Sequence, residues 1–248
     1  MLKPDYIDPV AFEIGPLSVH WYGIIMASAI FLGLIIALKE SKRRNLNPDT
    51  FLDLIIIAIP ISIVGARTYY VIFQWDYYSQ NIQDIIAVWE GGLAIHGALI
   101  GATLTAIIFT KIKGIKFWKI VDIAAPSLIL GQAIGRWGNF INQEAYGYKT
   151  DLPWGMYING AYRHPTFLYE SIWDLSVFIF LMWLKKRDNI KNGEVFLTYI
   201  MTYSLGRFFI ERLRTDSLML GSLRVAQVIS ILLIIGAGSL IYWRRNKA

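Results

Sequence analysis

The sequence IVDIAAPSLILGQAIGRWGNFINQEAYG, residues 120–147, joins an apolar run to a dense group of polar side chains. Its first fifteen residues are mostly apolar, as in a helix that crosses a membrane. In hydrocarbon an unpaired polar group costs several kcal/mol, and a charge about 2.5–3.5 kcal/mol. A helix end at the interface with a snorkelling Arg136 is the simplest explanation, but it leaves Asn139, Asn142 and Glu144 unexplained. The stretch therefore predicts a membrane helix that ends in a polar site.

The whole chain has the composition of a membrane protein. Of its 248 residues, 55% are hydrophobic and 17% are charged, and the mean hydropathy is +0.45. We therefore predict an all-α integral membrane protein in which residues 1–248 form a single polytopic domain. A membrane-spanning helix needs about 20 apolar residues. The seven predicted spans are residues 19–38, 52–73, 93–109, 120–134, 167–184, 195–213 and 225–243.

The basic residues indicate the orientation of these spans. Fifteen of the 24 Lys and Arg residues fall in three connections and the C-terminal end. They are Lys39, Lys42, Arg43, Arg44, Lys111, Lys113, Lys116, Lys119, Lys185, Lys186, Arg187, Lys191, Arg244, Arg245 and Lys247. These segments alternate with the other connections, and basic residues mark cytoplasmic loops. We predict an outside N-terminus and a cytoplasmic C-terminus. Because topology accounts for the net charge of +6, nucleic acid is not expected as a partner.

The chain contains no cysteine and three histidines. It therefore has no disulfide, no thiolate metal site and no cysteine nucleophile of its own. His20, His96 and His164 lack the i, i+4 or carboxylate spacing that metal ligands show. We expect no metal site, and nothing in the sequence indicates a cofactor.

Polar residues gather at the predicted outer ends of the spans. The first span begins at His20-Trp21-Tyr22, the third with the sequence EGGLAIHG at residues 90–97, and the fifth with RHPTFLYE at residues 163–170. The sixth span ends there with further polar side chains. Four separate segments thus direct polar groups toward one depth on one side, which predicts a functional site there.

The end of the sixth span carries a polar stripe. Tyr203, Arg207 and Glu211 are spaced i, i+4, i+8, so they share one helix face, and Arg214 would extend that face by another turn. Such a stripe should face the bundle interior or a wet cavity rather than lipid. The alternative to a functional role is an Arg207–Glu211 ion pair that only fixes helix packing, and the two roles are compatible.

Arg136 and Arg207 lie at similar predicted depths on different spans. Two guanidiniums that converge in a membrane cavity indicate an anion, and arginine binds phosphate through paired hydrogen bonds. At the outer surface this predicts a phospholipid headgroup, with neutral donors such as Asn139 and Asn142 beside it. The alternative is that each arginine pairs only with a carboxylate, Glu144 or Glu211.

Two further residues stand out in the apolar spans. His96 lies in a glycine-rich turn at the start of the third span, and histidine exchanges protons near neutral pH. A structural histidine is the alternative. Arg67 lies inside the second span, where pairing with Asp53 or a backbone carbonyl would be sufficient to hold it. Gly97-xxx-Gly101 and Gly131-xxx-Gly135 have the spacing of helix-packing motifs.

Residues 135–147 resemble the signature of the prolipoprotein diacylglyceryl transferase family, G-R-x-G-N-F-x-N-x-E-x-x-G, at every specified position. The resemblance continues through His20-Trp21-Tyr22-Gly23, Gly92-Leu93-Ala94-Ile95-His96-Gly97, His164-Pro165-Thr166 and Gly206-Arg207-Phe208-Phe209-Ile210-Glu211. It covers essentially the whole chain, and it implies seven spans with the N-terminus outside.

The resemblance implies a membrane transferase of lipoprotein biosynthesis in the bacterial cytoplasmic membrane. Such an enzyme moves the diacylglyceryl group of phosphatidylglycerol to the lipobox cysteine thiol of a prolipoprotein. The product is a thioether, glycerol phosphate leaves, and the reaction is the first step of lipoprotein maturation. The enzyme need supply no nucleophile, which agrees with the absence of cysteine.

Roles for individual residues follow from this chemistry and from the resemblance. Arg136 and Arg207 would stabilise the leaving phosphate. By the resemblance, Asn139, Asn142 and Glu144 would bind or orient the lipid, together with Tyr203.

The cysteine thiol, with a usual pKa of about 8.5, needs a base. His96 is the candidate, with Tyr22, Tyr203 and Glu211 as alternatives or helpers.

Three other classes of protein also collect polar groups in a membrane. A transporter or channel should show a polar path to both sides or paired broken helices, whereas here the polar groups lie in the outer half. An intramembrane protease needs a serine with a histidine, or paired aspartates, and Asp122 and Asp174 lack partners at comparable depth. A lipid-binding scaffold without catalysis would use the same arginines.

Overall fold

The computed structural model describes residues 7–246, which fold mainly into helices and form two compact units. The first unit comprises Met1–Ala37 with Val121–Ala248, and the second comprises Leu38–Ile120. Lys247, one of the basic residues predicted to be cytoplasmic, lies outside the described residues.

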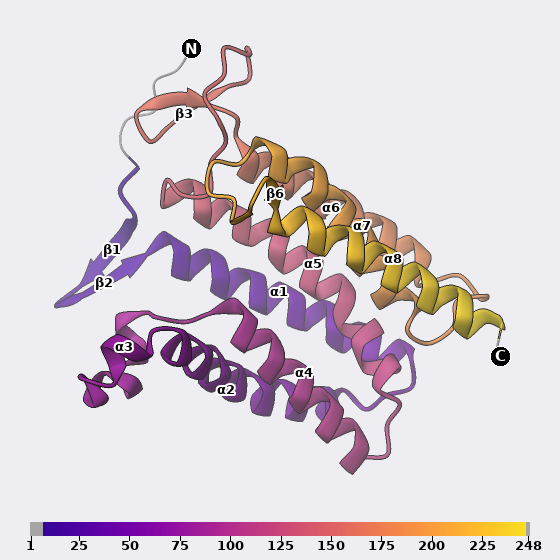
Figure 1. The fold of residues 1–248 in the computed structure, drawn as a ribbon. Helices are drawn as coiled ribbons and strands as arrows, with labels where there is room; N and C mark the ends of the chain where they lie inside the picture. Colours follow the sequence, from indigo (N-terminus) through magenta and orange to yellow (C-terminus); the bar gives the residue numbers. More distant parts are fainter. Residues whose placement is uncertain (1–6, 247–248) are drawn as a thin grey trace. The chain divides into compact units, whose positions relative to one another are not determined.

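The first unit contains most of the helices (Figure 1). They are α1 (Trp21–Arg43), which continues into the second unit, α5 (Phe117–Ile141), which begins there, α6 (Thr166–Leu184), α7 (Glu194–Ile210) and α8 (Val225–Asn246). A short 3-10 turn, η3 (Glu211–Leu213), continues directly from α7. Helix α7 packs against both α6 and α8.

Three small antiparallel hairpins complete this unit. They are β1 (Val10–Ile14) with β2 (Leu17–His20), β3 (Met156–Ile158) with β4 (Ala161–Arg163), and β5 (Met219–Leu220) with β6 (Leu223–Arg224). The pattern of apolar spans does not predict these hairpins. Asn159 and Gly160, which connect β3 to β4, have φ of 46° and 79°, the backbone that an Asn-Gly hairpin turn adopts.

The second unit is built on a helix pair, α2 (Pro48–Phe73) and α4 (Ile95–Ile112). Between them run α3 (Trp75–Tyr78), η1 (Ile82–Ile86) and η2 (Val88–Glu90). A Cβ added to Gly97 would lie 2.1 Å from the carbonyl oxygen of Gly65, and one on Gly101 would lie 2.8 Å from that of Ile61. The predicted packing role of Gly97-xxx-Gly101 is therefore confirmed.

The corresponding prediction for Gly131-xxx-Gly135 was wrong. A Cβ on Gly131 would meet no atom within 4 Å, and one on Gly135 would meet only the flexible end of Met26, at 3.6 Å. Sequence spacing alone does not say which face of a helix contacts its neighbour.

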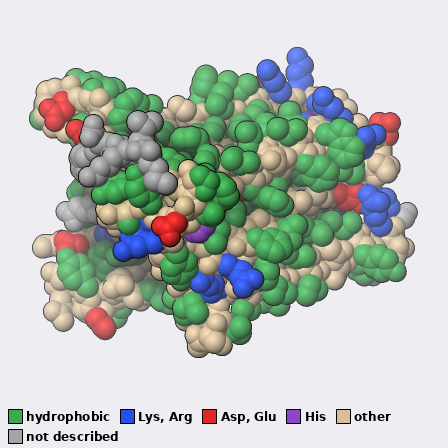
Figure 2. Space-filling view, turned by 90° about the horizontal axis from the view of Figure 1, so that it is seen from above, with side chains coloured by type: hydrophobic (Ala, Val, Ile, Leu, Met, Phe, Trp, Pro, Cys, Tyr) green, Lys and Arg blue, Asp and Glu red, His purple; other side chains and the backbone are tan. Residues whose placement is uncertain are grey.

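Within the described residues 7–246, six helices are long and apolar enough to cross a membrane: α1, α2, α4, α5, α6 and α8. They coincide with six of the seven predicted spans. Large hydrophobic side chains remain exposed along these helices, and hydrophobic side chains cover much of the face in Figure 2. This surface suits contact with lipid rather than water.

Helix α5 is longer than the predicted span of residues 120–134 at both ends. It begins at Phe117 and ends at Ile141, so Arg136 and Asn139 are helical. Backbone hydrogen bonds, rather than side-chain polarity, maintain a helix, and here neighbouring helices supply partners for the polar side chains.

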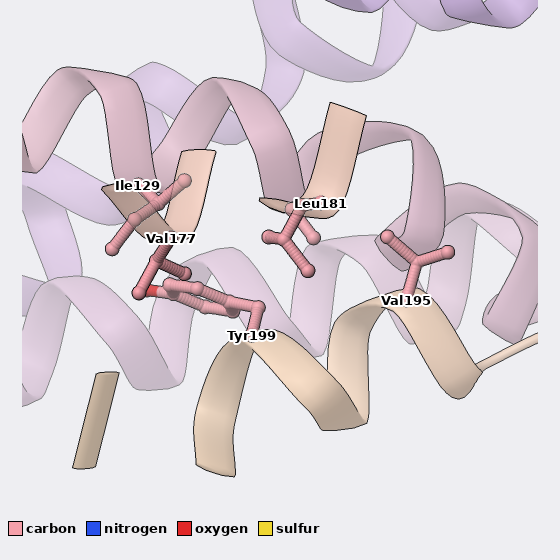
Figure 3. Close-up of a cluster of buried hydrophobic side chains, with 6 residues drawn as sticks. Ile129, Val177, Leu181, Val195 and Tyr199 are labelled. Atoms are coloured by element: carbon pink, nitrogen blue, oxygen red, sulfur yellow. The ribbon is translucent and has the colours of Figure 1, made fainter. Parts of the chain in front are cut away.

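The core of the first unit lies among α5, α6 and α7 (Figure 3). Its buried members are Ala125, Ile129, Val177, Leu181, Val195 and Tyr199. Asp122, near the start of α5, accepts hydrogen bonds from the backbone N–H groups of Gly193 (2.7 Å) and Phe196 (2.9 Å), at the start of α7. The carboxylate satisfies free N–H groups at that helix end and so fixes α7 to α5.

Candidate active site

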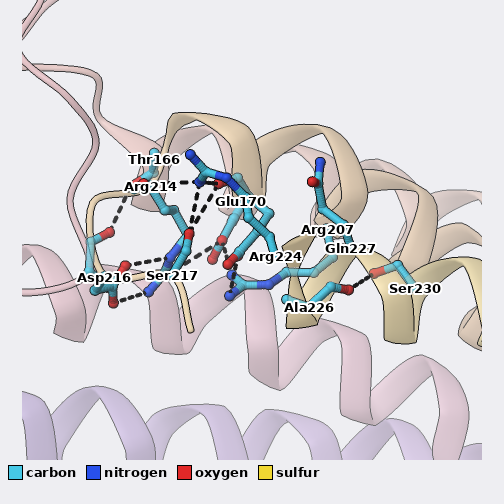
Figure 4. Close-up of polar contacts among 12 residues, drawn as sticks. Thr166, Glu170, Arg207, Arg214, Asp216, Ser217, Arg224, Ala226, Gln227 and Ser230 are labelled. Carbon is cyan, nitrogen blue, oxygen red and sulfur yellow. Dashed lines mark hydrogen bonds and ion pairs between the residues drawn. The ribbon is translucent and has the colours of Figure 1, made fainter. Parts of the chain in front are cut away.

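A single carboxylate, Glu170 on α6, lies against three arginines from other segments. The ion-pair distances are 2.7 Å to Nε of Arg136 on α5, 2.6 Å to Nη1 of Arg207 on α7, and 3.2 Å to Nη1 of Arg214 beyond η3. Figure 4 shows Glu170 between Arg207 and Arg214. The predicted convergence of Arg136 and Arg207 is confirmed, and Glu170 is the group that joins them.

Each of two arginines also binds a second carboxylate. Nη2 of Arg207 lies 2.7 Å from Oε2 of Glu211, the i, i+4 ion pair that the sequence predicts. Arg214 donates two hydrogen bonds to Asp216, at 2.9 and 2.6 Å. Arg214 does not extend the helical stripe as expected, because the chain is extended there, with φ −80° and ψ 147°. It reaches the same cluster from the connection that follows.

Arg136 and Arg207 are partly accessible, whereas the carboxylates that they contact are buried. The side chains of Arg136 and Arg207 are 19% and 21% exposed, against 5% for Glu170 and 2% for Glu211. An approaching anion therefore meets guanidinium groups before it meets carboxylate. The Arg136–Glu170 contact is close in distance but lacks hydrogen-bond alignment. Within residues 7–246, the terminal nitrogens of Arg136 have no hydrogen-bond partner, so they are free to bind a ligand.

A fourth arginine, Arg224, ties the connection after α7 together (Figure 4). Its Nη1 donates to the carbonyl oxygens of Glu211 and Arg214 and to Oγ of Ser217. Its Nη2 donates to the hydroxyl of Tyr148 at 3.2 Å. Because these acceptors come from separate parts of the loops, Arg224 fixes the backbone that carries Arg214.

The second half of the 135–147 stretch forms a tight loop. Gln143 and Ala145 both have left-handed backbones, with φ of 53° and 54°. The hydroxyl of Thr166, at the start of α6, donates to the carbonyl of Ala145 at 2.7 Å. A Cβ on Gly147 would lie 2.6 Å from the Cβ of His164, so only glycine fits. The loop thus connects the end of α5 to the start of α6.

Of the predicted lipid-binding residues, Asn139, Asn142 and Glu144 lie in or beside this loop, and Tyr203 lies on α7. The amide of Asn139 donates a hydrogen bond to the carboxylate of Glu144 at 2.9 Å. The alternative in which Glu144 is the partner of Arg136 is therefore wrong. Asn142 is exposed. Tyr203 lies beside Tyr199, with ring centroids 6.1 Å apart. The Asn139–Glu144 bond orients two polar side chains at the accessible edge of the helix.

The candidate bases occupy different surroundings. The ring of Tyr22 lies against Gly138, where an added Cβ would be 2.5 Å from a ring carbon, and Tyr22 is 40% exposed. Glu211 is buried and paired with Arg207, which makes it an orienting group for that arginine. His96 belongs to the second unit, where its exposed ring stacks on Tyr69 at 5.7 Å.

Sequence reasoning missed two buried carboxylates of α6. Glu170 was read only as part of the 163–170 motif, and Asp174 was considered only as a protease residue. Asp174 is 2% exposed, and its Oδ2 has no hydrogen-bond partner within residues 7–246. Both carboxylates lie at i, i+4 on an otherwise apolar helix, and that placement was the signal available in the sequence.

Comparison with known proteins assigns the chain to a family. The family model for prolipoprotein diacylglyceryl transferase matches residues 9–243. The chain belongs to this family.

Named relatives match over nearly the same extent. A phosphatidylglycerol–prolipoprotein diacylglyceryl transferase of Bacillus licheniformis is 56% identical over 97% of this chain and 94% of its own length. Proteins of the same name from Listeria innocua and Geobacillus kaustophilus are 54% and 53% identical over 97% of this chain, and over 91% and 94% of their own lengths. A multi-pass membrane transferase of lipoprotein biosynthesis fits both the relatives and the apolar helices.

Proposed function

We propose that the chain transfers the diacylglyceryl group of phosphatidylglycerol to the lipobox cysteine of a prolipoprotein. The cysteine sulfur forms a bond to a glycerol carbon of the lipid. The carbon–oxygen bond to the phosphate breaks, and its electron pair leaves with glycerol phosphate. The thiol proton passes to a base. The observation that carries this proposal is the pair of accessible guanidiniums held at 2.6–2.7 Å from one buried carboxylate.

In this proposal Arg136 and Arg207 bind the phosphate and stabilise the charge that develops on it as the bond breaks. Glu211 and Glu170 hold Arg207 between them, so its orientation is set before the lipid arrives. Asn139, Asn142, Glu144 and Tyr203 orient the remainder of the headgroup.

His96 is the proposed base, since its exposed ring can meet a thiol and imidazole is the commonest general base in enzymes. Tyr22 is the next candidate, because it lies against the signature helix and is partly accessible. Replacing His96 with alanine should lower the rate about 100-fold or more. Tyr22→Ala, measured in the same assay, distinguishes the two candidate bases.

We further propose seven spans in the bacterial cytoplasmic membrane, with residues 1–248 as one polytopic domain. Helix α7 has 17 residues and extends about 26 Å, and the three residues of η3 bring it to about 32 Å, enough for a hydrocarbon core of about 30 Å. The distribution of basic residues supports an outside N-terminus and a cytoplasmic C-terminus.

A transfer assay tests the activity. Purified protein in detergent is mixed with phosphatidylglycerol and a lipobox peptide, and the peptide mass is followed. We expect a diacylglyceryl gain on the cysteine peptide and none on a serine peptide. No gain with folded protein, across several phospholipids, would leave the arginines as ligand holders in a binding or transport protein.

A further inference from the structure

Arg67, on α2 of the second unit, is a buried arginine whose hydrogen bonds to described residues all go to backbone carbonyls. It is 6% exposed. Its Nε donates to the carbonyl of Ile85 at 2.9 Å, and its Nη1 donates to the carbonyls of Gly91 (2.7 Å) and Gly92 (3.1 Å). Its Nη2 donates to the carbonyl of Asp84. The guanidinium therefore joins α2 to two places in the segment that leads to α4.

Neutral groups satisfy this charge. The carboxylate of Asp84 accepts instead from the hydroxyl of Tyr77, and Asp53 lies near Lys113. Among the described side chains, which exclude that of Glu90, Arg67 has no carboxylate partner, and its guanidinium lies 5.1 Å from the centre of the Tyr78 ring. Its planar fork uses Nε and both Nη nitrogens on four carbonyls, which the single ammonium of a lysine cannot reproduce.

The turn that Arg67 holds has a special backbone. Gly91 and Gly92 have φ of 91° and 65°, which side chains other than glycine rarely adopt. A Cβ on Gly92 would lie 2.4 Å from Nη1 of Arg67. The turn and the guanidinium thus fit each other closely, and a change on either side displaces the other.

The same face of α2 then sets the start of α4. The N–H of Ala94 donates to the carbonyl of Ala66 at 3.1 Å, next to Arg67. Gly97 packs on the backbone of α2, and the ring of His96, the residue before it, stacks on the ring of Tyr69. Because Ala66, Arg67 and Tyr69 of α2 all contact residues 91–96, the location of the His96 ring depends on the turn.

We propose that Arg67 is a positioning residue: by tying the Gly91–Gly92 turn to α2, it sets where α4 begins and hence where the His96 ring lies. This inference rests on the proposed role of His96 as the base. Arg67 itself touches no substrate, because its donors are directed at backbone carbonyls.

The test combines Arg67→Lys with a control that damages the same helix pair elsewhere. Gly101→Ala places a Cβ 2.8 Å from the carbonyl of Ile61, away from the turn. The full-length protein is compared for kcat and KM per folded enzyme, thermal unfolding, and hydrogen exchange of residues 91–97. Should Arg67→Lys fail to fold, Gly92→Ala displaces the same contact from the other side.

We expect Arg67→Lys to lower kcat about 10–100-fold with KM little changed, and to speed exchange in residues 91–97. Gly101→Ala should lower the unfolding temperature but leave kcat and that exchange near wild type. The double variant with His96→Ala should be no slower than His96→Ala alone, because both changes remove one function. Unchanged exchange in Arg67→Lys, or additive losses in the double variant, would overturn the positioning role.

Failure of the proposed base gives a different result. If His96→Ala alone kept the wild-type rate, the assignment of the base would be wrong, and positioning of that base would be overturned with it. Additive losses on top of a slowed but measurable His96→Ala rate would overturn only the role of Arg67.

Discussion

Two regions of the molecule hold arginines inside their helix packing, and the two regions pair them with different kinds of acceptor. In the first unit, Arg136 and Arg207 lie on the carboxylate of Glu170 and keep about a fifth of their side chains exposed. In the second unit, Arg67 is almost fully buried and binds four backbone carbonyls. The first arrangement leaves guanidinium edges open to an anion, and the second uses the guanidinium to fix a turn. Burial and the kind of acceptor, rather than the residue type, separate the arginines proposed to bind a ligand from the one that holds a turn.

The largest effect should come from removing the accessible arginines. Arg136→Ala and Arg207→Ala should each lower transfer by about 100-fold or more, because each removes a group that we propose stabilises the leaving phosphate. Arg187→Ala is the matched control, since Arg187 lies over the ring of Trp183 outside this cluster. Near-normal transfer by Arg136→Ala or Arg207→Ala, measured on protein that still inserts, would reject the phosphate-binding role.

Glu170 tests whether the carboxylate organises the arginines. Glu170→Gln keeps the side-chain shape but removes the charge, and breaking a buried ion pair costs about 3–5 kcal/mol. We expect a lower unfolding temperature and a rate reduced about tenfold or more. Asp216→Asn is the control, because Asp216 is 48% exposed and exposed pairs contribute about 0–1 kcal/mol. Equal effects of the two changes would show that Glu170 has no special place in the cluster.

Glycine substitutions sharpen the comparison between the units. Gly97→Ala would bring a Cβ to 2.1 Å from a backbone oxygen, and Gly138→Ala would bring one to 2.5 Å from the Tyr22 ring. A ring can turn aside more readily than a backbone can move, so Gly97→Ala should lose about 1–3 kcal/mol or more and Gly138→Ala less.

Gly131→Ala is the reference for both, because its Cβ enters open space and alanine favours a helix by about 1 kcal/mol. It should leave the unfolding temperature unchanged or slightly raised. Thermal unfolding in detergent measures all three variants, and a Gly138→Ala loss larger than that of Gly97→Ala would contradict the packing argument.

The smallest expected effect is that the local stability of the Arg214–Asp216 segment depends on pH, whereas that of the turn held by Arg67 does not. Burial alone would raise the pKa of Asp216, but the hydrogen bonds and charge of Arg214 outweigh it and hold that pKa below its usual value. The pair therefore stabilises the folded state fully above the unfolded pKa of about 3.9, and the contribution is lost as pH falls through the lower, folded value.

Hydrogen exchange, corrected for the intrinsic effect of pH, should show residues 214–217 loosening below about pH 4. Asp216→Asn should remove this dependence. The Arg67 contacts involve carbonyls, which do not titrate, so the 91–94 turn should not respond in this range. A parallel response of both segments would mean that the loosening is not specific to the Arg214–Asp216 pair.

Local patterns in the sequence predicted much of the site. The Arg136–Arg207 convergence and the Arg207–Glu211 pair follow from helical spacing and from the cost of placing charge in lipid. The dipeptide Asn159-Gly160 is a common hairpin turn, so the β3–β4 hairpin could also have been predicted from the sequence. The extension of α5 through Ile141 could not, because the apolar run ends at residue 134 and the helix continues through polar residues.

What the sequence alone determined is the class of protein: apolar runs of sufficient length require membrane helices, and residues 135–147 with the other shared motifs indicate the family. What only the tertiary structure decided is which groups meet. Glu170 contacts three arginines from different segments, Asp122 of α5 satisfies the start of α7, and Arg67 binds a distant turn. Periodicity in a sequence gives the face of a helix on which a side chain lies, but the partner opposite that face depends on how the helices pack.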